Sequence, residues 1–499
     1  MQRITPDRTH PLFDTAATRR IEQIAAANLP PHALMQRAGL AVARLALALA
    51  PHARTIWIAC GPGNNGGDGL EAATQLHLHG KTVVVTWLGS EASAPADSLA
   101  ALARARAAGV VFADVPPTAL SAQDLCIDAL LGIGSSHAPA GTMAAWITAM
   151  NASPAPTLAI DLPTGLQADT GNFAMQSIAS SADEISSNGT INAQYTLCLL
   201  GLKPGLFTGH GRDTAGQVWL DDLGITLGNA PTPPTAPTAQ LVGTPLPAYR
   251  THASHKGSYG DVAILGGAPG MAGAALLAAS AALHAGAGRV FVGLLDDGSS
   301  LGVHPQQPEL MFRAPSALPL HALAVVCGCG GGEAVRALLP RVLLEAAQLV
   351  LDADALNAIA TDTALQAQLR ARSTQSLPTV LTPHPLEAAR LLGCSTAHIQ
   401  ADRLGAAQQL ADRFACVVVL KGSGTVIAAP SQMLHINPTG NGRLATAGTG
   451  DVLAGMVGAR LAMGQHAMAA ACDAVFAHGL AANNWPSGQP LTASALARN

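Results

Sequence analysis

The sequence predicts an α/β protein with two domains. Short apolar runs such as Thr55–Cys60 and Val417–Leu420 end at Gly, Asp or Lys and alternate with Ala-rich helical stretches. This alternation is typical of a parallel sheet wrapped by helices. It occurs once in each half of the chain, and a stretch rich in Pro, Thr and Ala separates the two halves.

That separating stretch, residues 228–247, reads GNAPTPPTAPTAQLVGTPLP and has the composition of a linker. We therefore expect a first domain over residues 1–227 and a second over residues 248–499. A polar, Ser-rich stretch, Gln176–Gly189, is interpreted as a surface insertion in the first domain.

Helical periodicity predicts helices over Arg19–Ala27 and Ala33–Leu49. In open α/β sheets, ligands bind at the carboxyl ends of the strands, so polar residues just after each strand are the first candidates for a site. Buried strands are expected at Thr55–Cys60, Thr82–Leu88, Leu125–Ala129, Thr157–Ile160, Val262–Leu265, Val290–Leu294, Ala324–Cys327, Leu349–Leu351, Thr379–Leu381 and Val417–Leu420.

The charge balance excludes some partners. A net charge of −4 gives no reason to expect nucleic acid or an anionic membrane. The stretch between Asp261 and Arg289 has no charged residue, but its glycines argue against a membrane span.

The eight cysteines are scattered without a CxxC pair, which predicts a reducing compartment and no structural zinc. With no signal-peptide pattern at the N-terminus, we expect the cytoplasm.

The sharpest motif of the first half is Gly61–Gly69, GPGNNGGDG, between a predicted strand and a predicted helix. Such a loop exposes backbone N–H groups that suit a phosphate. The alternative is a plain glycine-rich turn with Asn and Asp in left-handed positions. The density of Gly, Asn and Asp exceeds what one turn needs, so we favour a ligand site.

Two acids stand at further strand ends, Asp128 and Asp161. Either acid alone could be a turn or N-cap residue. Together with the Asn-Gly loop they converge on one edge of the sheet. A carboxylate, an amide oxygen and a hydroxyl form a hard-oxygen set that suits a group I or II cation.

In the second half, Gly448-Thr449-Gly450-Asp451 opens a helical stretch. Its backbone N–H groups can neutralise a transferring phosphoryl group, and its Asp can take the proton of an attacking hydroxyl. The alternative is an N-cap Asp. The glycine turn Lys421–Thr425 adds a cation but is no Walker A loop. His384 follows a strand, a position that favours a ligand role although a lone His is more often structural.

The first half resembles the YjeF N-terminal domain, the NAD(P)H-hydrate epimerase family, through the loop Gly61–Gly69 and the segments Asp128–Gly134 and Asp161–Gly165. The resemblance covers residues 14–226 and implies a Rossmann-like three-layer fold, inversion at the hydrated carbon of the nicotinamide ring, and Asp161 as acid/base. It implies a K⁺ ion held by Asn65, Asp128 and Thr164. It implies substrate contacts by Asn64, Asn65, Gly66, Gly67, Asp68, Gly132, Ile133, Gly134, Ser135, Ser136, His137, Ala138 and Asp161.

The second half resembles the YjeF C-terminal domain, the ribokinase-like NAD(P)H-hydrate dehydratase family, over residues 248–483. The shared motifs include D-A-D-A-L-N, T-P-H-P, K-G-x-G-T and G-T-G-D. The resemblance implies phosphorylation of the hydrate's hydroxyl and elimination of phosphate, with ADP and Mg²⁺ and with Asp451 as the catalytic residue. It implies hydrate contacts by Ala274, Gly330, His384 and Asp451, and nucleotide contacts by Lys421, Gly422, Ser423, Gly424, Thr425 and Gly450.

This half departs from the family pattern at two places. Cys327–Gly331 stands where the family has G-P-G-L-G, and Gly442-Arg443-Leu444 stands where it has Pro-Gly-Met.

The resulting hypothesis is a bifunctional repair enzyme acting on hydrated NAD(P)H and ADP, expected to form a homo-oligomer. One alternative is a small-molecule kinase for a vitamin or sugar with a non-catalytic N-terminal binding domain, since the G-T-G-D turn fits both. A non-enzymatic interaction module ranks last, because the acids Asp68, Asp128, Asp161 and Asp451 are all present.

Overall fold

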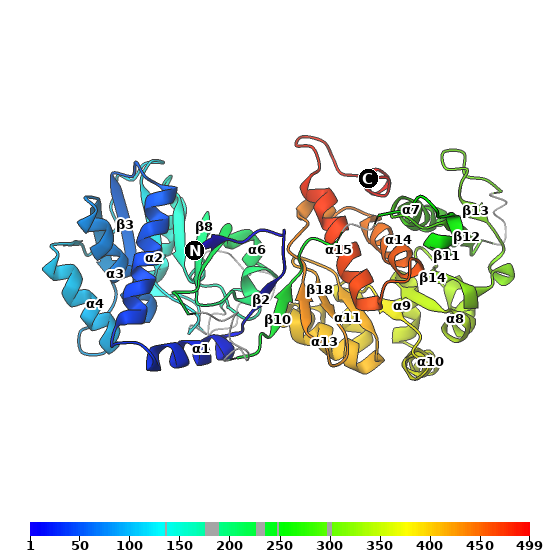
Figure 1. Cartoon of the computed structure of the whole chain (residues 1–499), viewed down its shortest axis with the longest axis horizontal. Helices are drawn as coiled ribbons and strands as arrows, with labels where there is room; N and C mark the ends of the chain where they lie inside the picture. Colours follow the sequence, from blue (N-terminus) through cyan, green and yellow to red (C-terminus); the bar gives the residue numbers. More distant parts are fainter. Residues whose placement is uncertain (135–136, 175–188, 226–234, 247–248, 297–301) are drawn as a thin grey trace. The chain divides into compact units, whose positions relative to one another are not determined.

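The computed structural model describes residues 1–134, 137–174, 189–225, 235–246, 249–296 and 302–499 (Figure 1). It divides into two compact units, one of residues 1–5 and 10–239 and one of residues 6–9 and 240–499. The boundary at Ala239 falls within the stretch 228–247 that we interpret as a linker. Residues 228–234 and 247 of that stretch, and residues 176–188 of the Ser-rich one, lie outside the described residues.

The first unit alternates strands and helices along the chain. Its elements are β1 (Gln2–Arg3), β2 (His10–Leu12), α1 (Thr15–Ala27), α2 (Ala33–Leu49), β3 (Thr55–Cys60), α3 (Asn64–Leu78), β4 (Thr82–Trp87), α4 (Ala96–Ala107), β5 (Val111–Phe112), β6 (Leu125–Ala129), α5 (Gly141–Ala152), β7 (Thr157–Ile160), β8 (Tyr195–Leu199), α6 (Gly211–Thr214) and β9 (Gln217–Asp221).

Its sheet has the order β1-β9-β8-β7-β6-β3-β4-β5, and every neighbouring pair except β1 with β9 is parallel. The chain runs outward from β3 through β4 to β5, and then crosses back to β6. The strand order therefore reverses between β3 and β6, and a crevice opens at such a switch point beyond the carboxyl ends of the strands.

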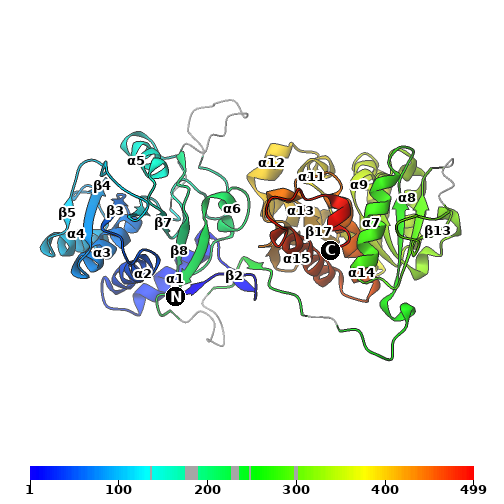
Figure 2. The ribbon, with the colours of Figure 1, turned by 90° about the horizontal axis from the view of Figure 1, so that it is seen from above.

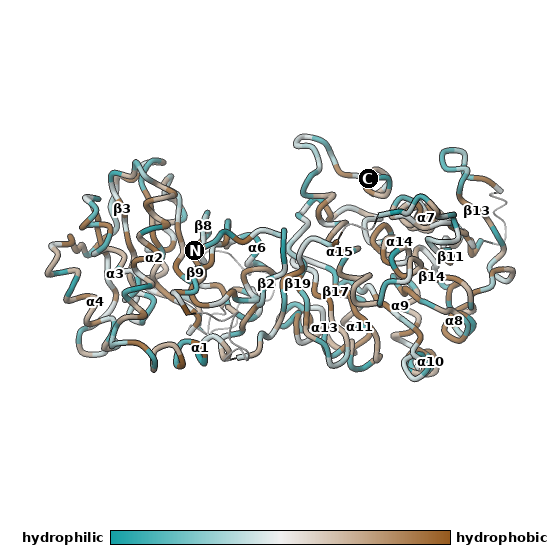
Figure 3. Tube along the Cα trace, viewed as in Figure 1, coloured by the Kyte–Doolittle hydropathy of each residue, from teal (hydrophilic) through white to brown (hydrophobic). Residues whose placement is uncertain are grey.

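Alternate residues of these strands enter two different cores, as expected for a sheet covered on both faces. Ile56 and Ile58 pack with helices α1 to α4, whereas Trp57 and Ala59 pack with α5. In Figure 2, α2 and α5 lie on opposite sides of the strands β7 and β8. In Figure 3, α1 alternates between hydrophilic and hydrophobic residues along its length, which is the pattern of a helix with one buried stripe.

The second unit repeats this plan. Its elements are β10 (Ala239–Leu241), β11 (Asp261–Gly266), α7 (Ala272–His284), β12 (Arg289–Leu294), β13 (Met311–Phe312), β14 (Ala324–Cys327), α8 (Ala334–Glu345), β15 (Gln348–Leu351), α9 (Ala353–Ala360), α10 (Thr363–Thr374), β16 (Thr379–Leu381), α11 (Pro385–Leu392), α12 (Thr396–Ala401), α13 (Arg403–Phe414), β17 (Val417–Leu420), β18 (Val426–Ala428), β19 (Leu434–Ile436), α14 (Thr449–Ala462), α15 (Ala467–Asn483) and α16 (Ala493–Leu496).

Its strands run in the order β13-β12-β11-β14-β15-β16-β17-β18-β19-β10. The pairs from β13 to β17 are parallel, and β18 and β19 add antiparallel strands. One core packs α8 to α13 on the sheet, and the other packs α7, α14 and α15. The predicted α/β class with two αβα domains is confirmed.

The predicted strands all form, most with the predicted bounds and the others within one residue of them. Two predicted helix starts are wrong. The helix expected from Arg19 begins at Thr15, because the Asp14 side chain accepts a hydrogen bond from the N–H of Ala17 at 2.6 Å and caps it. The loop expected over Gly61–Gly69 ends at Gly63, and α3 begins at Asn64.

No helix within the described ranges is long and apolar enough to cross a membrane.

Candidate active sites

The first site lies at the carboxyl edge of the N-terminal sheet. A cavity of about 540 Å³ opens there, beyond the ends of β3, β6 and β7. Of the predicted site residues, it is lined by Asn64, Asn65, Asp68, Gly132, Ile133, Gly134, His137 and Asp161. Gly66, Gly67 and Ala138 do not line it, and Ser135 and Ser136 lie outside the described residues.

Close packing explains why the Gly-rich motif continues into α3. A Cβ on Gly66 would lie 2.0 Å from the carbonyl oxygen of Gly61, and one on Gly69 would lie 2.5 Å from Cβ of Ala129. Only glycine allows the first turns of the helix to approach the ends of β3 and β6 so closely. The glycines therefore place the start of α3, with Asn64, Asn65 and Asp68, at the cavity.

Asp128 and Thr164 meet beneath the cavity. The carboxylate of Asp128 is fully buried and accepts hydrogen bonds from the N–H of Thr164 at 2.8 Å, its hydroxyl at 2.7 Å and the N–H of Leu130 at 3.1 Å. Burial raises the pKa of Asp128 to about 6, and the hydrogen bonds from Thr164 and Leu130 counter part of that effect. No cationic side chain of the described residues forms an ion pair with this carboxylate.

Asn65 lies beside Gly132, in the segment that follows Asp128. Its Nδ2 is buried without a hydrogen-bond partner among the described residues, and its side chain is next to Gly132, where a Cβ would lie 3.4 Å from Cβ of Asn65. A buried carboxylate without a cationic partner, together with a hydroxyl and a nearby amide, has the oxygen chemistry that suits a group I or II cation.

Asp161 follows β7 and has a left-handed backbone, with φ of 68°. Its Oδ1 forms an ion pair with Nζ of Lys203, which is fully buried, and accepts a hydrogen bond from the N–H of Leu199 at 3.2 Å. Lys203 also lines the cavity, and the sequence analysis missed it. The available signal was a single charge in the otherwise apolar run LCLLGLKPGLF, since a lysine is almost never fully buried unless it is paired.

Several carboxyl groups face the same cavity. Burial, followed by the charges of Asp161 and Glu22, raises the pKa of Asp68 well above its usual value. Burial, followed by the charge of Asp161, also raises the pKa of Glu22. Asp161 is ion-paired with Lys203, whereas burial favours the protonated form of Asp68, so Asp68 is the candidate acid of this site.

The second site lies at the carboxyl edge of the C-terminal sheet. Nζ of Lys421, after β17, lies 2.8 Å from Oδ1 of Asp352, after β15. A Cβ on Gly450 would lie 3.2 Å from the same Nζ, so the first turn of α14 reaches this ion pair. The predicted nucleotide residues Lys421 and Gly450 are therefore neighbours, although they come from different elements.

Arg403 supports the turn that follows Lys421. Its guanidinium is buried and donates to the carbonyls of Leu420 at 3.3 Å and Lys421 at 3.2 Å. A Cβ on Gly422 would lie 2.8 Å from Nη1 of Arg403, and the φ of Gly422 is 137°. Glycine is thus required where this turn passes over the arginine. The turn continues through Ser423, Gly424 and Thr425, whose hydroxyl donates to the carbonyl of Gly422 at 3.2 Å.

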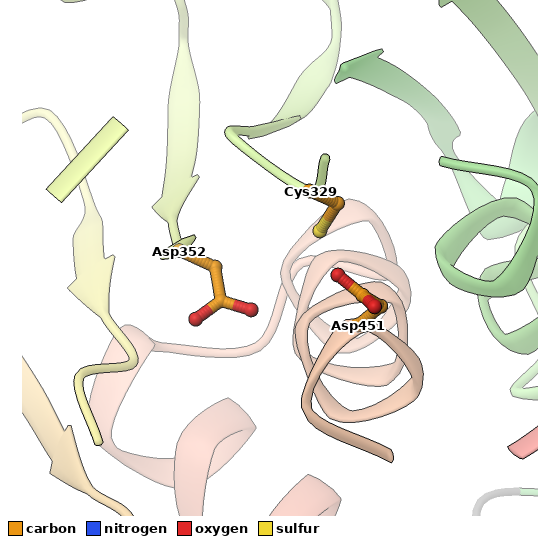
Figure 4. A group of neighbouring side chains, drawn as sticks. All are labelled: Cys329, Asp352 and Asp451. Atoms are coloured by element: carbon orange, nitrogen blue, oxygen red, sulfur yellow. The ribbon is translucent and has the colours of Figure 1, made fainter. Parts of the chain in front are cut away.

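Asp451 points toward the end of β14. One ligand-capable atom each from Cys329, Asp352 and Asp451 lies within 4.8 Å of the others, and Figure 4 shows the three side chains converging. Burial, followed by the charge of Asp352, raises the pKa of Asp451 to about 6, while a hydrogen bond from the Cys329 thiol lowers it. Burial raises the pKa of Cys329 well above its usual value, so the thiol remains a donor.

The remaining predicted residues of this site take two different positions. Gly330 adjoins Ala274, since a Cβ on Gly330 would lie 2.9 Å from Cβ of Ala274. His384 caps α11: its Nδ1 accepts from the N–H of Leu386 at 3.1 Å, and its Nε2 lies 3.2 Å from Oε1 of Glu387. Both ring nitrogens of His384 thus face its own helix. Burial raises the pKa of Glu387 to about 7, although the charge of Lys421 lowers it.

Comparisons with known proteins cover both units. The family model described as YjeF-related protein N-terminus matches residues 31–205, and the one described as NAD(P)H-hydrate dehydratase matches residues 262–498. The bifunctional NAD(P)H-hydrate repair enzyme of Escherichia coli is 38% identical, covering 95% of this chain and 89% of that protein.

Two further comparisons concern the second unit. The ADP-dependent (S)-NAD(P)H-hydrate dehydratase of Neisseria meningitidis is 42% identical, covering 50% of this chain and 84% of that protein. A crystal structure of the ADP/ATP-dependent dehydratase of Bacillus subtilis is 33% identical with a TM-score of 0.44, covering 50% of this chain and 90% of that one. The full-length similarity and the two family matches show that this chain belongs to the family of bifunctional NAD(P)H-hydrate repair enzymes.

Proposed function

We propose that this chain restores hydrated NADH and NADPH in two steps. The N-terminal unit interconverts the R and S hydrates, and the C-terminal unit dehydrates the S form at the expense of ADP. The observation that carries this proposal is the position of Asp451, in the first turn of α14 beside the ion pair of Lys421 and Asp352. A partly buried base next to a cation and a glycine turn is suited to phosphorylating a hydroxyl.

In the C-terminal site, Asp451 accepts the proton of the hydrate's hydroxyl while the oxygen attacks the terminal phosphorus of ADP and AMP leaves. The N–H groups at the start of α14 and the ammonium of Lys421 offset the charge on the transferring group. Phosphate then leaves with the C–O electron pair, a proton leaves the neighbouring carbon, and the ring double bond returns. Mg²⁺ bound with the nucleotide would neutralise part of the charge of its phosphates.

The relative from Neisseria meningitidis supports ADP as the donor through its printed name. We propose nucleotide contacts by Lys421–Thr425 and Gly450, and hydrate contacts by Ala274, Gly330 and Asp451. For His384 we propose contact through the exposed edge of its ring, because its ring nitrogens face its own helix.

In the N-terminal site, we propose that the hydrate occupies the cavity and that Asp161 is the acid/base group. K⁺ bound by Asn65, Asp128 and Thr164 would supply the positive charge that the buried Asp128 carboxylate lacks. The same carboxylate accepts a hydrogen bond from the N–H of Leu130, and residues Leu130–Gly134 line the cavity, so the ion would hold this segment along one wall. The proposed substrates are small molecules, and the proposed location is the cytoplasm. A homo-oligomer remains a prediction, which light scattering would test.

The experiment that tests this function follows the near-ultraviolet absorbance of reduced nicotinamide. The full chain is mixed with R and S hydrates, Mg²⁺ and either ADP or ATP. Complete recovery of NAD(P)H is expected. Recovery that stops at the S fraction would remove the epimerase assignment, and no recovery with either nucleotide would favour the small-molecule kinase alternative.

A further inference from the structure

Lys203, the buried ion-pair partner of Asp161, is the feature of the N-terminal cavity that the proposed function does not use. Lys203 is fully buried and its side chain reaches the cavity from the segment after β8. Asp161 follows β7, the neighbouring strand. Breaking such a pair leaves an uncompensated buried charge, so both residues depend on one another.

The hydrogen bonds of Lys203 are directed inward. An ammonium has three N–H donors. Here Nζ donates to Oδ1 of Asp161 and to the carbonyl of Leu199 at 2.8 Å. Both of these hydrogen bonds hold the ammonium against the protein, and the side chain is fully buried.

The two oxygens of Asp161 differ. Oδ1 receives both Nζ of Lys203 and the N–H of Leu199 at 3.2 Å. Oδ2 receives no hydrogen bond from the residues that the structure describes. The side chain is 12% exposed and lines the cavity, so its remaining surface faces the substrate space.

We propose that Lys203 is a positioning residue that clamps Oδ1 of Asp161 and thereby presents Oδ2 as the proton acceptor of the epimerase reaction. This inference rests on the proposed function of the N-terminal unit. The left-handed backbone of Asp161 supports it, because a non-glycine residue keeps that conformation only where its surroundings require it. The clamp supplies such a requirement.

The chemistry gives this acceptor a defined role. The hydrated carbon is bonded to the ring nitrogen, because water adds to an enamine at the carbon next to nitrogen. When the hydroxyl takes a proton from the carboxyl group of Asp68, the C–O bond breaks, water departs and the nitrogen lone pair forms a C=N⁺ bond. Water then adds to the opposite face, its oxygen pair forms the new C–O bond, and its proton passes to Oδ2 of Asp161. Exchange with solvent returns both acids to their starting forms.

The first test is Lys203→Met in the full chain, with Lys81→Met as the matched control in the same unit. Lys81 is partly exposed and donates only to the carbonyls of Pro51 and Ala53. Interconversion of R and S hydrates is expected to slow about 100-fold or more in Lys203→Met, as for loss of a general base. Dehydration of pure S hydrate by the same preparation should be unchanged. A rate within threefold of the unsubstituted chain would overturn the proposal.

The second test covers the case in which Lys203→Met fails to fold. The pair Asp161→Asn with Lys203→Met removes both charges, so neither is left buried and unpaired. If Lys203 acts only through Asp161, this double variant has the same residual epimerase rate as Asp161→Asn alone. A further tenfold loss in the double variant would show that Lys203 acts elsewhere and would overturn the proposal.

A pH profile separates positioning from a merely structural role. The charged and titratable groups that interact with Asp161 are Lys203, Glu22, Asp68 and Cys198. Removing the ammonium takes away the only cation that pairs with this carboxylate among the described residues, so the pH profile of epimerase kcat/KM should change in Lys203→Met and stay unchanged in Lys81→Met. Identical pH profiles for the two variants would contradict the clamp. If the unsubstituted chain shows no epimerisation, the proposed function fails instead.

Discussion

The ammonium of Lys421 lies 2.8 Å from the carboxylate of Asp352. The Lys421 side chain is 19% exposed and the Asp352 side chain is 2% exposed. They follow β17 and β15, so the pair spans the carboxyl ends of three neighbouring strands. It lies beside Gly450 and Asp451, which open α14. The pair thus joins the sheet edge to the helix that carries the proposed base.

Replacing Lys421 by Met is expected to destabilise the C-terminal unit by about 3 kcal/mol or more, because Asp352 is left buried without a partner. The measurement is the denaturant midpoint of this unit's transition in the full chain. Lys256→Met, at an exposed position of the same unit, is the control. The double variant Lys421→Met with Asp352→Asn should recover most of the stability without recovering dehydratase activity. Equal stability of the single variant and the unsubstituted chain would contradict this prediction.

The dehydratase rate should follow the ionisation of Asp451. The pKa of this carboxyl is raised to about 6, chiefly by burial. A general base acts only when ionised, so activity should be level above pH 6 and fall about tenfold per pH unit below it. Asp451→Asn should lower kcat by about 100-fold or more with ADP binding retained. If Asp451→Asn keeps some activity and that activity still falls below pH 6, the loss of activity at acid pH belongs to another group.

Replacing Cys329 by Ala should move that acid limb to higher pH. The thiol donates to the Asp451 carboxylate and so lowers its pKa, and alanine removes this donor. Cys327→Ala is the matched control, because Cys327 is equally buried at the end of β14 and burial is the cause of its own raised pKa. Identical pH profiles for the two variants would show that the Cys329 hydrogen bond has no effect on the base.

Replacing Thr164 by Val tests the K⁺ site. The hydroxyl that donates to Asp128 at 2.7 Å is lost, and with it one proposed ligand of the ion. Replacing Na⁺ in the buffer by K⁺ should stabilise the unsubstituted chain, by about 2.7 kcal/mol when the K⁺ concentration is 100 times its Kd. The same replacement should stabilise Thr164→Val much less. Thr196→Val removes an equally buried hydroxyl from β8 and should keep the full K⁺ effect. The same gain from K⁺ in both variants would place the ion elsewhere.

Replacing Gly66 by Ala should destabilise the N-terminal unit by about 1–3 kcal/mol, because the new Cβ would lie 2.0 Å from the carbonyl oxygen of Gly61. Gly63→Ala is the control, since a Cβ there meets no atom within 4 Å. Thermal unfolding of the full chain, read together with separate epimerase and dehydratase assays, measures the effect. A Gly66→Ala chain as stable as Gly63→Ala would contradict the close packing of α3 on the strand ends.

The strands were predictable because a strand that is buried on both faces of a sheet is a short apolar run in the sequence. Thr55–Cys60 and Val417–Leu420 form strands with the predicted bounds. The start of α3 was not predictable in the same way. A run of glycines and asparagines has weak helix propensity, and its helical form depends on contact with Gly61 and Ala129, which only the assembled sheet supplies.

For the two sites, too, some features follow from the sequence alone and others only from the tertiary structure. The sequence by itself determined the α/β class, the two-domain family and the acids at the strand ends, because local pattern and motif spacing carry that information. Only the tertiary structure decided their partners. Lys203 lies 42 positions from Asp161, and Lys421 lies 69 positions from Asp352. Parallel strands joined by helices bring such distant residues to one edge of a sheet, and burial there makes an opposite charge necessary.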